Sequence, residues 1–316
     1  MKLGIALSGG GAKGFAHIGV LSVLEKAGIE FSAVSGTSMG AFVGAFYAAD
    51  KLGDLQQGAV GIKLRDIPLL LSPTLSKKGF MTGKKIIRFL KESLGKEKIE
   101  ELSKKYAAVC ADLNNGEVVT FTEGDLISAV RASIAIPGLF IPVVFNNKLL
   151  VDGGILEPLP VRAVRELGSD FVVGVDVITG SIDHPGGHRK RNDSDSMNVD
   201  SGLSSIYEII KSFAKTDKNK LINEKDIKYV FDKLSVVSIL KRSILLNQKQ
   251  LISHVLERFP VDFLIRPDLT GVGVSDFHRA EHIIEIGKNE AEKIEMELKD
   301  IINQFHLKRS SGSSEN

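Results

Sequence analysis

The chain has 316 residues, of which 43% are hydrophobic, and its formal net charge at pH 7 is +2. These values are typical of a globular protein with a sizeable core, and the small net charge gives no electrostatic indication of a nucleic-acid partner. The single cysteine, Cys110, excludes an internal disulfide and fits a reducing compartment. Neither a signal peptide nor a membrane-spanning stretch is recognisable. We therefore expect a cytoplasmic protein, with peripheral membrane contact left open.

Short apolar runs alternate with segments of helical periodicity over the first 178 residues. Residues 3–7 form a strand-like run, residues 15–26 have helical spacing, and residues 31–35 form a second short strand. We further predict helices over 39–49, 83–94, 126–132 and 160–166, and strands over 107–112, 117–122, 148–151 and 171–177. Because strands and helices alternate and several strands are continuously hydrophobic, we expect an α/β fold with a sheet covered on both faces.

The character of the sequence changes after residue 177. Residues 178–205 are polar, which favours a loop or lid, and residues 203–256 have a helical pattern with a basic polar side. An apolar stripe in this part either contacts a membrane surface or packs on the core, and it consists of Leu203, Ile206, Tyr207, Ile210, Phe213 and Ala214. A strand over 263–266 and a closing helix over 277–298 follow, and we expect residues 306–316 to be disordered.

The first strand is followed by Gly9, Gly11 and Gly14, which have the spacing of a dinucleotide-binding loop. Such a site also needs an acidic residue at the end of the second strand, whereas Glu30 precedes that strand. A phosphate-binding P-loop would need a lysine where Phe15 stands. A dinucleotide-dependent enzyme therefore stays only as an alternative, and we expect no organic cofactor.

The second strand leads into GTSMG, a G-x-S-x-G sequence between a strand and a helix. A sharp turn at this place lifts the Ser38 hydroxyl out of the sheet edge, and Gly36 and Gly40 let the backbone turn without a Cβ clash. The positive end of the following helix favours negative charge at Ser38. We interpret Ser38 as a nucleophile, and the alternative is a serine N-cap beside packing glycines.

The glycine loop acquires a role beside this serine. The loop and Ser38 follow successive strands, and the carboxyl ends of neighbouring parallel strands lie together. The N–H groups of Gly9, Gly10 and Gly11 can therefore hydrogen-bond the oxyanion that forms as a carbonyl carbon becomes tetrahedral. Lys13 adds positive charge nearby, as an electrostatic and structural support.

A serine nucleophile needs a proton acceptor, and the histidines are weak candidates for it. His17 lies in the first predicted helix, where packing or a local hydrogen bond explains it better. His278 and His282 form an H-x-x-E-H pattern, which is found in zinc proteases. No acidic ligand can be assigned to them, and an amphipathic helix explains the segment, so we expect no metal.

A carboxylate is the remaining candidate for the base. Asp152 follows a short apolar strand, and Gly153 and Gly154 after it permit close approach by another backbone. Its ordinary pKa of about 3.9 makes it a poor base in water, so the site would have to desolvate it. Taken alone, the sequence is explained better by an Asx turn before a glycine loop.

Three motifs occur together in this chain, in the order GGGAKG, GTSMG and DGG. In this they resemble the patatin-like phospholipases, with their glycine-rich anion loop, nucleophile elbow and Asp-Gly-Gly/Ala motif. RASIAIPGLFIPV at 131–143 and LVDGGILEPLPVRAVRELGSDFVVGVDV at 150–177 are similar to the bacterial branch, which resembles the catalytic domain of neuropathy target esterase. The resemblance implies a three-layer α/β/α fold with a mainly parallel sheet. It also implies one catalytic domain over 1–305, with a variable polar loop and helical insert at 179–259.

The resemblance further implies a Ser–Asp dyad without histidine. Ser38 is then the nucleophile, Asp152 the base and Gly9–Gly11 the oxyanion loop, and Lys13 occupies the family's basic position. The sequence thus predicts a serine acyl hydrolase that cleaves lipid carboxylic esters through an acyl-enzyme. The alternative is a non-hydrolytic acyl-binding or regulatory protein on the same fold. We expect a lipid ester as partner, and the oligomeric state is not predicted.

Overall fold

The computed structural model describes residues 1–66, 81–179 and 236–312. Met1–Ile182 and Leu245–Asn316 form one compact unit, and Asp183–Ile244 form a second. The sheet and the site described below belong to the first unit. The apolar stripe at 203–214 lies outside the described residues, as does the predicted lid except for its first two positions.

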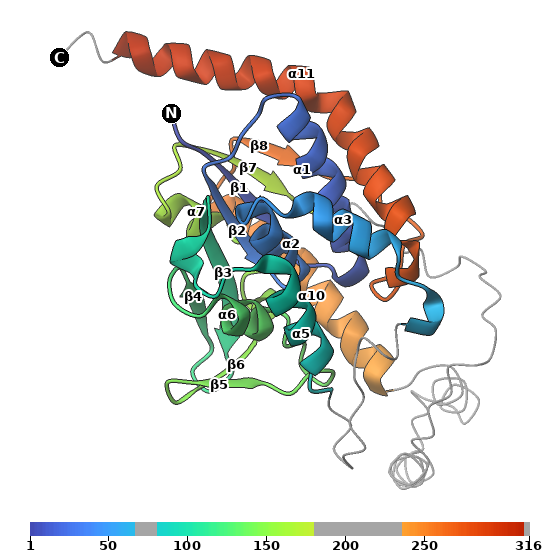
Figure 1. Cartoon of the computed structure of the whole chain (residues 1–316). Helices are drawn as coiled ribbons and strands as arrows, with labels where there is room; N and C mark the ends of the chain where they lie inside the picture. The colour runs from blue at the N-terminus through green and yellow to red at the C-terminus, as the bar shows by residue number, and fades with distance from the viewer. Residues whose placement is uncertain (67–80, 180–235, 313–316) are drawn as a thin grey trace, which may run out of the picture. The chain divides into compact units, whose positions relative to one another are not determined.

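The described ranges contain one sheet of eight strands (Figure 1). The strands are β1 (Leu3–Leu7), β2 (Ala33–Thr37), β3 (Lys105–Asp112), β4 (Glu117–Phe121), β5 (Val143–Phe145), β6 (Lys148–Asp152), β7 (Phe171–Val175) and β8 (Phe263–Ile265). They lie in the order β5-β6-β3-β2-β1-β7-β8, and β4 also pairs with β3. The five strands from β3 to β8 in this order are parallel, whereas β4 and β6 are antiparallel to β3 and β5 is antiparallel to β6. The sheet is therefore mainly parallel, as predicted.

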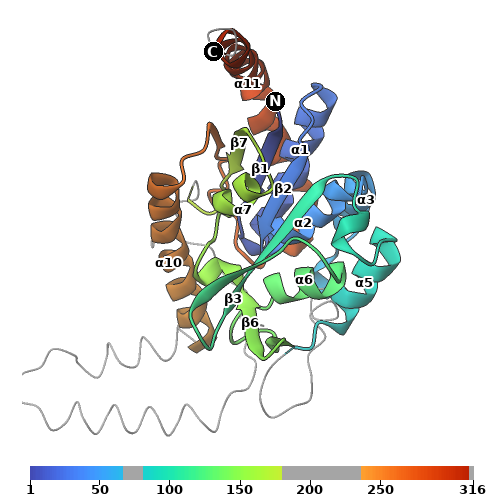
Figure 2. The same ribbon diagram turned by 90° about the vertical axis from the view of Figure 1, so that its left-hand side faces the viewer.

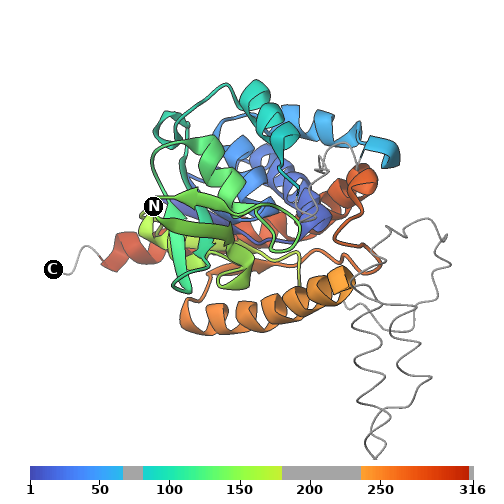
Figure 3. The same ribbon diagram turned by 90° about the horizontal axis from the view of Figure 1, so that it is seen from below.

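Helices cover both faces of this sheet. They are α1 (Ala16–Lys26), α2 (Met39–Ala48), α3 (Leu52–Val60), α5 (Lys84–Leu94), α6 (Leu126–Ser133), α7 (Val161–Glu166), α10 (Val236–Arg258) and α11 (Ala280–Gly312). Figure 2 shows α7 and α10 on one side of the strands and α2 and α3 on the other, and Figure 3 shows the orange helix α10 along the lower side of the sheet.

The alternation of side chains along β1 explains the three layers. Ile5 and Leu7 belong to an apolar cluster shared with α1, α2, α3 and α11. Ala6, which points to the opposite face, belongs to a second cluster shared with α7 and α10. Because the strand buries both faces, its sequence is continuously hydrophobic and needs a helical layer on each side. The predicted three-layer α/β/α fold is confirmed.

Element boundaries differ from the sequence prediction in a few places. β2 continues to Thr37 because its pairing with β3 continues that far, whereas its pairing with β1 ends at Gly36. Gly11–Phe15 form a 3-10 helix before α1, and the short elements α3 and β5 were not predicted. α11 extends to Gly312 and so passes residue 306, where the sequence predicts that disorder begins. Within the described ranges, no helix combines the length and the apolar character needed to cross a bilayer.

One segment ties together the carboxyl ends of the central strands. The backbone carbonyls of Glu157, Pro158 and Pro160 accept hydrogen bonds from β2 and from the loop after β1. Their donors are the Thr37 hydroxyl at 2.8 Å, the Gly9 amide at 3.0 Å and the Ser35 hydroxyl at 2.7 Å, respectively. Because this segment follows directly after the loop that carries Asp152, it brings that loop to the edge where β1 and β2 end.

Candidate active site

Ser38 occupies a sharp turn between a strand and a helix. β2 ends at Thr37, α2 begins at Met39, and Ser38 between them has φ 56° and ψ −123°. A serine with positive φ is uncommon, and such backbone strain persists only where surrounding structure holds it. This is the geometry of a nucleophile elbow, in which the side chain is presented at the edge of the sheet.

Two glycines make this turn possible because backbones approach closely on both sides of the serine. A Cβ on Gly40 would lie 2.2 Å from the carbonyl oxygen of Leu7, and a Cβ on Gly36 would lie 2.3 Å from the carbonyl oxygen of Gly40. Both distances are far below any real carbon–oxygen contact. α2 is therefore packed directly on β1 and β2 at the point where it leaves Ser38.

Asp152 reaches Ser38 through the topology of the sheet. It is the last residue of β6, where it pairs with Cys110 of β3, and β3 lies beside β2. The Ser38 hydroxyl donates to Asp152 Oδ2 at 2.5 Å, and the Gly154 amide donates to Asp152 Oδ1 at 2.8 Å. The structure thus brings together two residues that are 114 positions apart in the chain.

Burial changes the acidity of this carboxyl group. Ser38 and Asp152 are only 5% and 4% exposed, respectively. Loss of solvation raises the pKa of Asp152 from 3.8 to about 6, although the hydrogen bonds from Ser38 and Gly154 act in the opposite direction. A carboxylate with this pKa is a stronger base than one in water and is still ionised at neutral pH.

Ser133, which was not predicted from the sequence, accepts a hydrogen bond from the nucleophile elbow. The Ser38 amide donates to Ser133 Oγ at 2.9 Å, and the Ser133 hydroxyl donates to the carbonyl of Val109 in β3 at 2.6 Å. Ser133 is fully buried at the end of α6. A serine between the apolar residues Ala132 and Ile134 was the available signal, because a buried hydroxyl needs a partner.

The glycine loop lies against the serine, but its three amides differ. A Cβ on Gly9 would lie 3.4 Å from the Cβ of Ser38, so the loop and the elbow are in contact. The Gly9 amide donates to Pro158, which occupies it. Gly10 and Gly11 have positive φ values of 144° and 57°, and no hydrogen bond joins their amides to another residue in the described part of the chain.

Lys13 and His17 lie in the two helical segments that follow this loop. Lys13 is 1% exposed, and its amide donates to the Gly10 carbonyl at 3.3 Å. His17 is fully buried, and its Nε2 lies 2.8 Å from the carbonyl of Ser8, not at Ser38. Burial lowers the pKa of His17 to about 4, so the ring is neutral at pH 7 and its Nε2–H donates to Ser8.

The Asp-Gly-Gly loop is packed tightly on two sides. A Cβ on Gly153 would lie 2.4 Å from the carbonyl oxygen of Val109, and a Cβ on Gly154 would lie 2.2 Å from Nε2 of Gln248. Gln248 belongs to α10 and was also missed by the sequence reasoning. Its signal was a polar residue at a position where the helical spacing of α10 calls for an apolar one.

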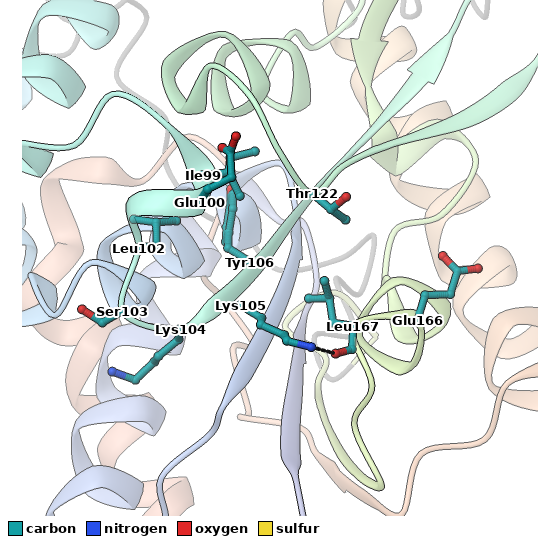
Figure 4. Close-up of a pocket in the computed structure, with 10 residues that line it drawn as sticks. All are labelled: Ile99, Glu100, Leu102, Ser103, Lys104, Lys105, Tyr106, Thr122, Glu166 and Leu167. Atoms are coloured by element: carbon teal, nitrogen blue, oxygen red, sulfur yellow. Dashed lines mark hydrogen bonds between the residues drawn. The ribbon is translucent and has the colours of Figure 1, made fainter.

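Two other features lie away from this arrangement. Among the described residues, no group of three or more His, Cys, Asp or Glu side chains could hold a metal ion, and His278 and His282 are part of no such group. A pocket of about 420 Å³ lies at the amino end of β3 (Figure 4). Lys105, which lines it, donates to the carbonyl of Leu167 at 2.8 Å. Because β3 and β2 are parallel, this pocket is at the opposite edge of the sheet from Ser38.

The part of the chain that carries this site matches a known protein family. Residues 5–165 match the family described as patatin-like phospholipase, and this range contains the glycine loop, Ser38 and Asp152. The chain belongs to this family. It is accordingly an enzyme of the lipid ester hydrolase class.

Relatives of the chain are found in bacteria and fungi. An uncharacterized NTE family protein of Mycobacterium tuberculosis is 30% identical over 322 residues, which span 91% of this chain and 89% of that protein. Lysophospholipases NTE1 of Aspergillus fumigatus and Candida albicans are 28% and 27% identical, respectively, over 90% and 92% of this chain. This chain spans only 18% and 20% of those two fungal proteins.

Proposed function

We propose that the protein hydrolyses carboxylic esters of lipids through a Ser38–Asp152 dyad and a covalent acyl-enzyme. The observation that supports this most strongly is the 2.5 Å hydrogen bond from the Ser38 hydroxyl to Asp152 Oδ2 in a buried place. The serine donates directly to the carboxylate, with no histidine between them. The raised pKa of Asp152 suits it to accept a proton near neutral pH.

Acylation begins when the Ser38 oxygen attacks the ester carbonyl carbon. Asp152 accepts the hydroxyl proton, and the carbonyl becomes a tetrahedral oxyanion. As this intermediate collapses, the bond to the alkoxy oxygen breaks, and Asp152 passes the proton to the departing alcohol. The acyl group then remains as an ester on Ser38.

The oxyanion needs hydrogen-bond donors close to Ser38. The sequence predicts the amides of Gly9, Gly10 and Gly11 as these donors. We propose only those of Gly10 and Gly11, because the Gly9 amide already donates to the carbonyl of Pro158. Removing one such donor typically slows an enzyme by about 10²–10³-fold. Lys13 is the basic residue of the 3-10 helix that follows this loop, and in this proposal its positive charge supports the oxyanion.

Deacylation uses the same base, with water as the nucleophile and Ser38 Oγ as the leaving oxygen. Water attacks the acyl carbon, Asp152 accepts a proton from this water, and the bond between the acyl carbon and Ser38 Oγ breaks. Asp152 then returns its proton to Ser38 Oγ, and the fatty acid leaves. No metal or organic cofactor takes part in these steps. Peripheral contact with a membrane stays a prediction, because the stripe proposed for it lies outside the described residues.

The test is hydrolysis by the purified full chain on a panel of lysophospholipids, phospholipids and chromogenic short-chain esters. We expect Ser38→Ala to lower turnover at least about 10³-fold with an unchanged circular-dichroism spectrum. A fluorophosphonate probe should add one covalent label, located at Ser38 by peptide mass spectrometry. Ser32→Ala is the matched control, because Ser32 is an exposed serine bonded to the Leu3 carbonyl, and it should behave as wild type.

Two results would contradict the proposal. Undiminished hydrolysis in Ser38→Ala would show that another nucleophile acts. A folded wild type with no turnover of any ester, but with saturable binding of acyl chains, would favour the non-hydrolytic acyl-binding alternative.

A further inference from the structure

Gln248 occupies a buried position on the inner face of α10. Leu245, Ile252 and Val255 share this face at helical spacing and pack in the apolar cluster that covers β1 and β7. Gln248 stands between them and is only 9% exposed. A carboxamide among apolar neighbours needs a polar partner, because burying an unpaired amide is unfavourable.

The Gln248 side chain ends beside the catalytic carboxylate. The point where a Cβ on Gly154 would stand is 2.2 Å from Gln248 Nε2 and 3.0 Å from Asp152 Oδ1. The neighbouring Asn247 also contacts this loop, since its Nδ2 donates to the carbonyl of Ile155 at 3.4 Å. α10 therefore packs against the loop that carries the base, and its inward-facing glutamine ends near that base.

The hydrogen-bonding capacity of this carboxamide is not used by the described residues. In the described ranges no residue bonds to its nitrogen or its oxygen. Both atoms still touch solvent, since neither is among the fully enclosed polar atoms that lack a partner. Water can therefore hydrogen-bond this carboxamide, and water is also the molecule that deacylation consumes.

We propose that Gln248 holds the water that hydrolyses the acyl-enzyme, an inference that rests on the proposed Ser38–Asp152 mechanism. In the free enzyme Asp152 Oδ2 accepts the Ser38 hydroxyl. Once Ser38 is acylated its oxygen carries no proton, so Oδ2 becomes an open acceptor. A water molecule donates one proton to this oxygen and is oriented by Gln248, whose carboxamide both donates and accepts.

In this arrangement, deacylation forms one bond to the acyl carbon and breaks another. The water oxygen bonds to the acyl carbon while Asp152 takes a water proton. The bond from the acyl carbon to Ser38 Oγ breaks, and the proton passes from Asp152 to Oγ. Gln248 gains and loses no proton, so it contributes orientation alone, which acts only on the step that consumes water.

This role predicts a separation of the two half-reactions. We would mix wild type, Gln248→Ala and Gln248→Leu with a p-nitrophenyl ester. Released nitrophenol would report acylation, and the intact mass of quenched samples would report the acyl-enzyme. The Gln248 variants should acylate within about twofold of wild type and deacylate about 10- to 100-fold more slowly, so that acyl-enzyme accumulates. The value of kcat should fall while kcat/KM is nearly unchanged.

Controls separate this role from packing and from failure of the underlying mechanism. Gln250→Ala changes an exposed glutamine two residues further along α10 and should match wild type in both steps. Equal slowing of acylation and deacylation in Gln248→Leu, which keeps the side-chain bulk, would indicate a structural role and overturn the inference. Unchanged deacylation in both Gln248 variants would also overturn it, while wild type still forms its adduct on Ser38. If wild type forms no adduct and Ser38→Ala retains activity, the dyad itself is wrong.

Discussion

Replacing Asp152 with asparagine should abolish hydrolysis. The stability of this variant relative to wild type should also be greater at neutral pH than at acid pH. Asparagine has the same shape and can accept from the Gly154 amide while it donates to Ser38. It cannot accept a proton, so the base is lost. It also carries no charge, so the cost of keeping an ionised carboxylate buried is removed.

The size of this effect follows from the pKa of the carboxyl group. Burial raises the pKa of Asp152 from 3.8 to about 6. Because the folded state binds the proton more tightly, the carboxyl contributes stability at low pH that is lost as pH rises from about 4 to about 6. Each pKa unit corresponds to about 1.4 kcal/mol, so the stability difference between Asp152→Asn and wild type should grow by about 2–3 kcal/mol between pH 4 and pH 7.

Urea unfolding of both proteins at half-unit pH steps from 4 to 7.5 measures this difference. The comparison uses its pH dependence, so a constant offset caused by the substitution itself does not matter. Asp300→Asn, at an exposed aspartate in α11, is the control and should give a difference that hardly changes with pH. A flat difference curve for Asp152→Asn would refute the reasoning, because the carboxyl would then be as acidic in the folded protein as in water.

Two further predictions concern the pH profile and the elbow. The value of kcat/KM for ester hydrolysis should fall about tenfold from pH 7 to pH 5, since only ionised Asp152 accepts a proton and its pKa is about 6. His17, with a pKa of about 4, cannot produce this limb, and a level profile to pH 5 would exclude Asp152 as the base. Gly40→Ala should destabilise the fold by about 3 kcal/mol or more in urea unfolding, because its Cβ would meet the Leu7 carbonyl at 2.2 Å. Gly53→Ala in α3, where a Cβ meets nothing within 4 Å, should be neutral or stabilise by up to about 1 kcal/mol; equal stability losses in the two variants would contradict this packing argument.

The features that the sequence determines by itself are local ones. Hydrophobic runs in β1 and β7 indicate strands buried on both faces, and helical spacing indicates α1 and α2, because these patterns depend on residues close in the chain. The G-x-S-x-G sequence places Ser38 between a strand and a helix for the same reason. The prediction was weaker where boundaries depend on partners, as in β2, which continues as far as β3 pairs with it.

The composition of the site was decided only by the tertiary structure. Asp152 meets Ser38 because β6 pairs with β3 in antiparallel register, and the pairing partner of a strand is not written in its own residues. The same packing occupies the Gly9 amide with Pro158 and brings Ser133 and Gln248 to the elbow and the base. Desolvation of Asp152 has this origin too: a carboxyl that is acidic in water becomes a base because distant segments close over it, and no local pattern encodes that burial.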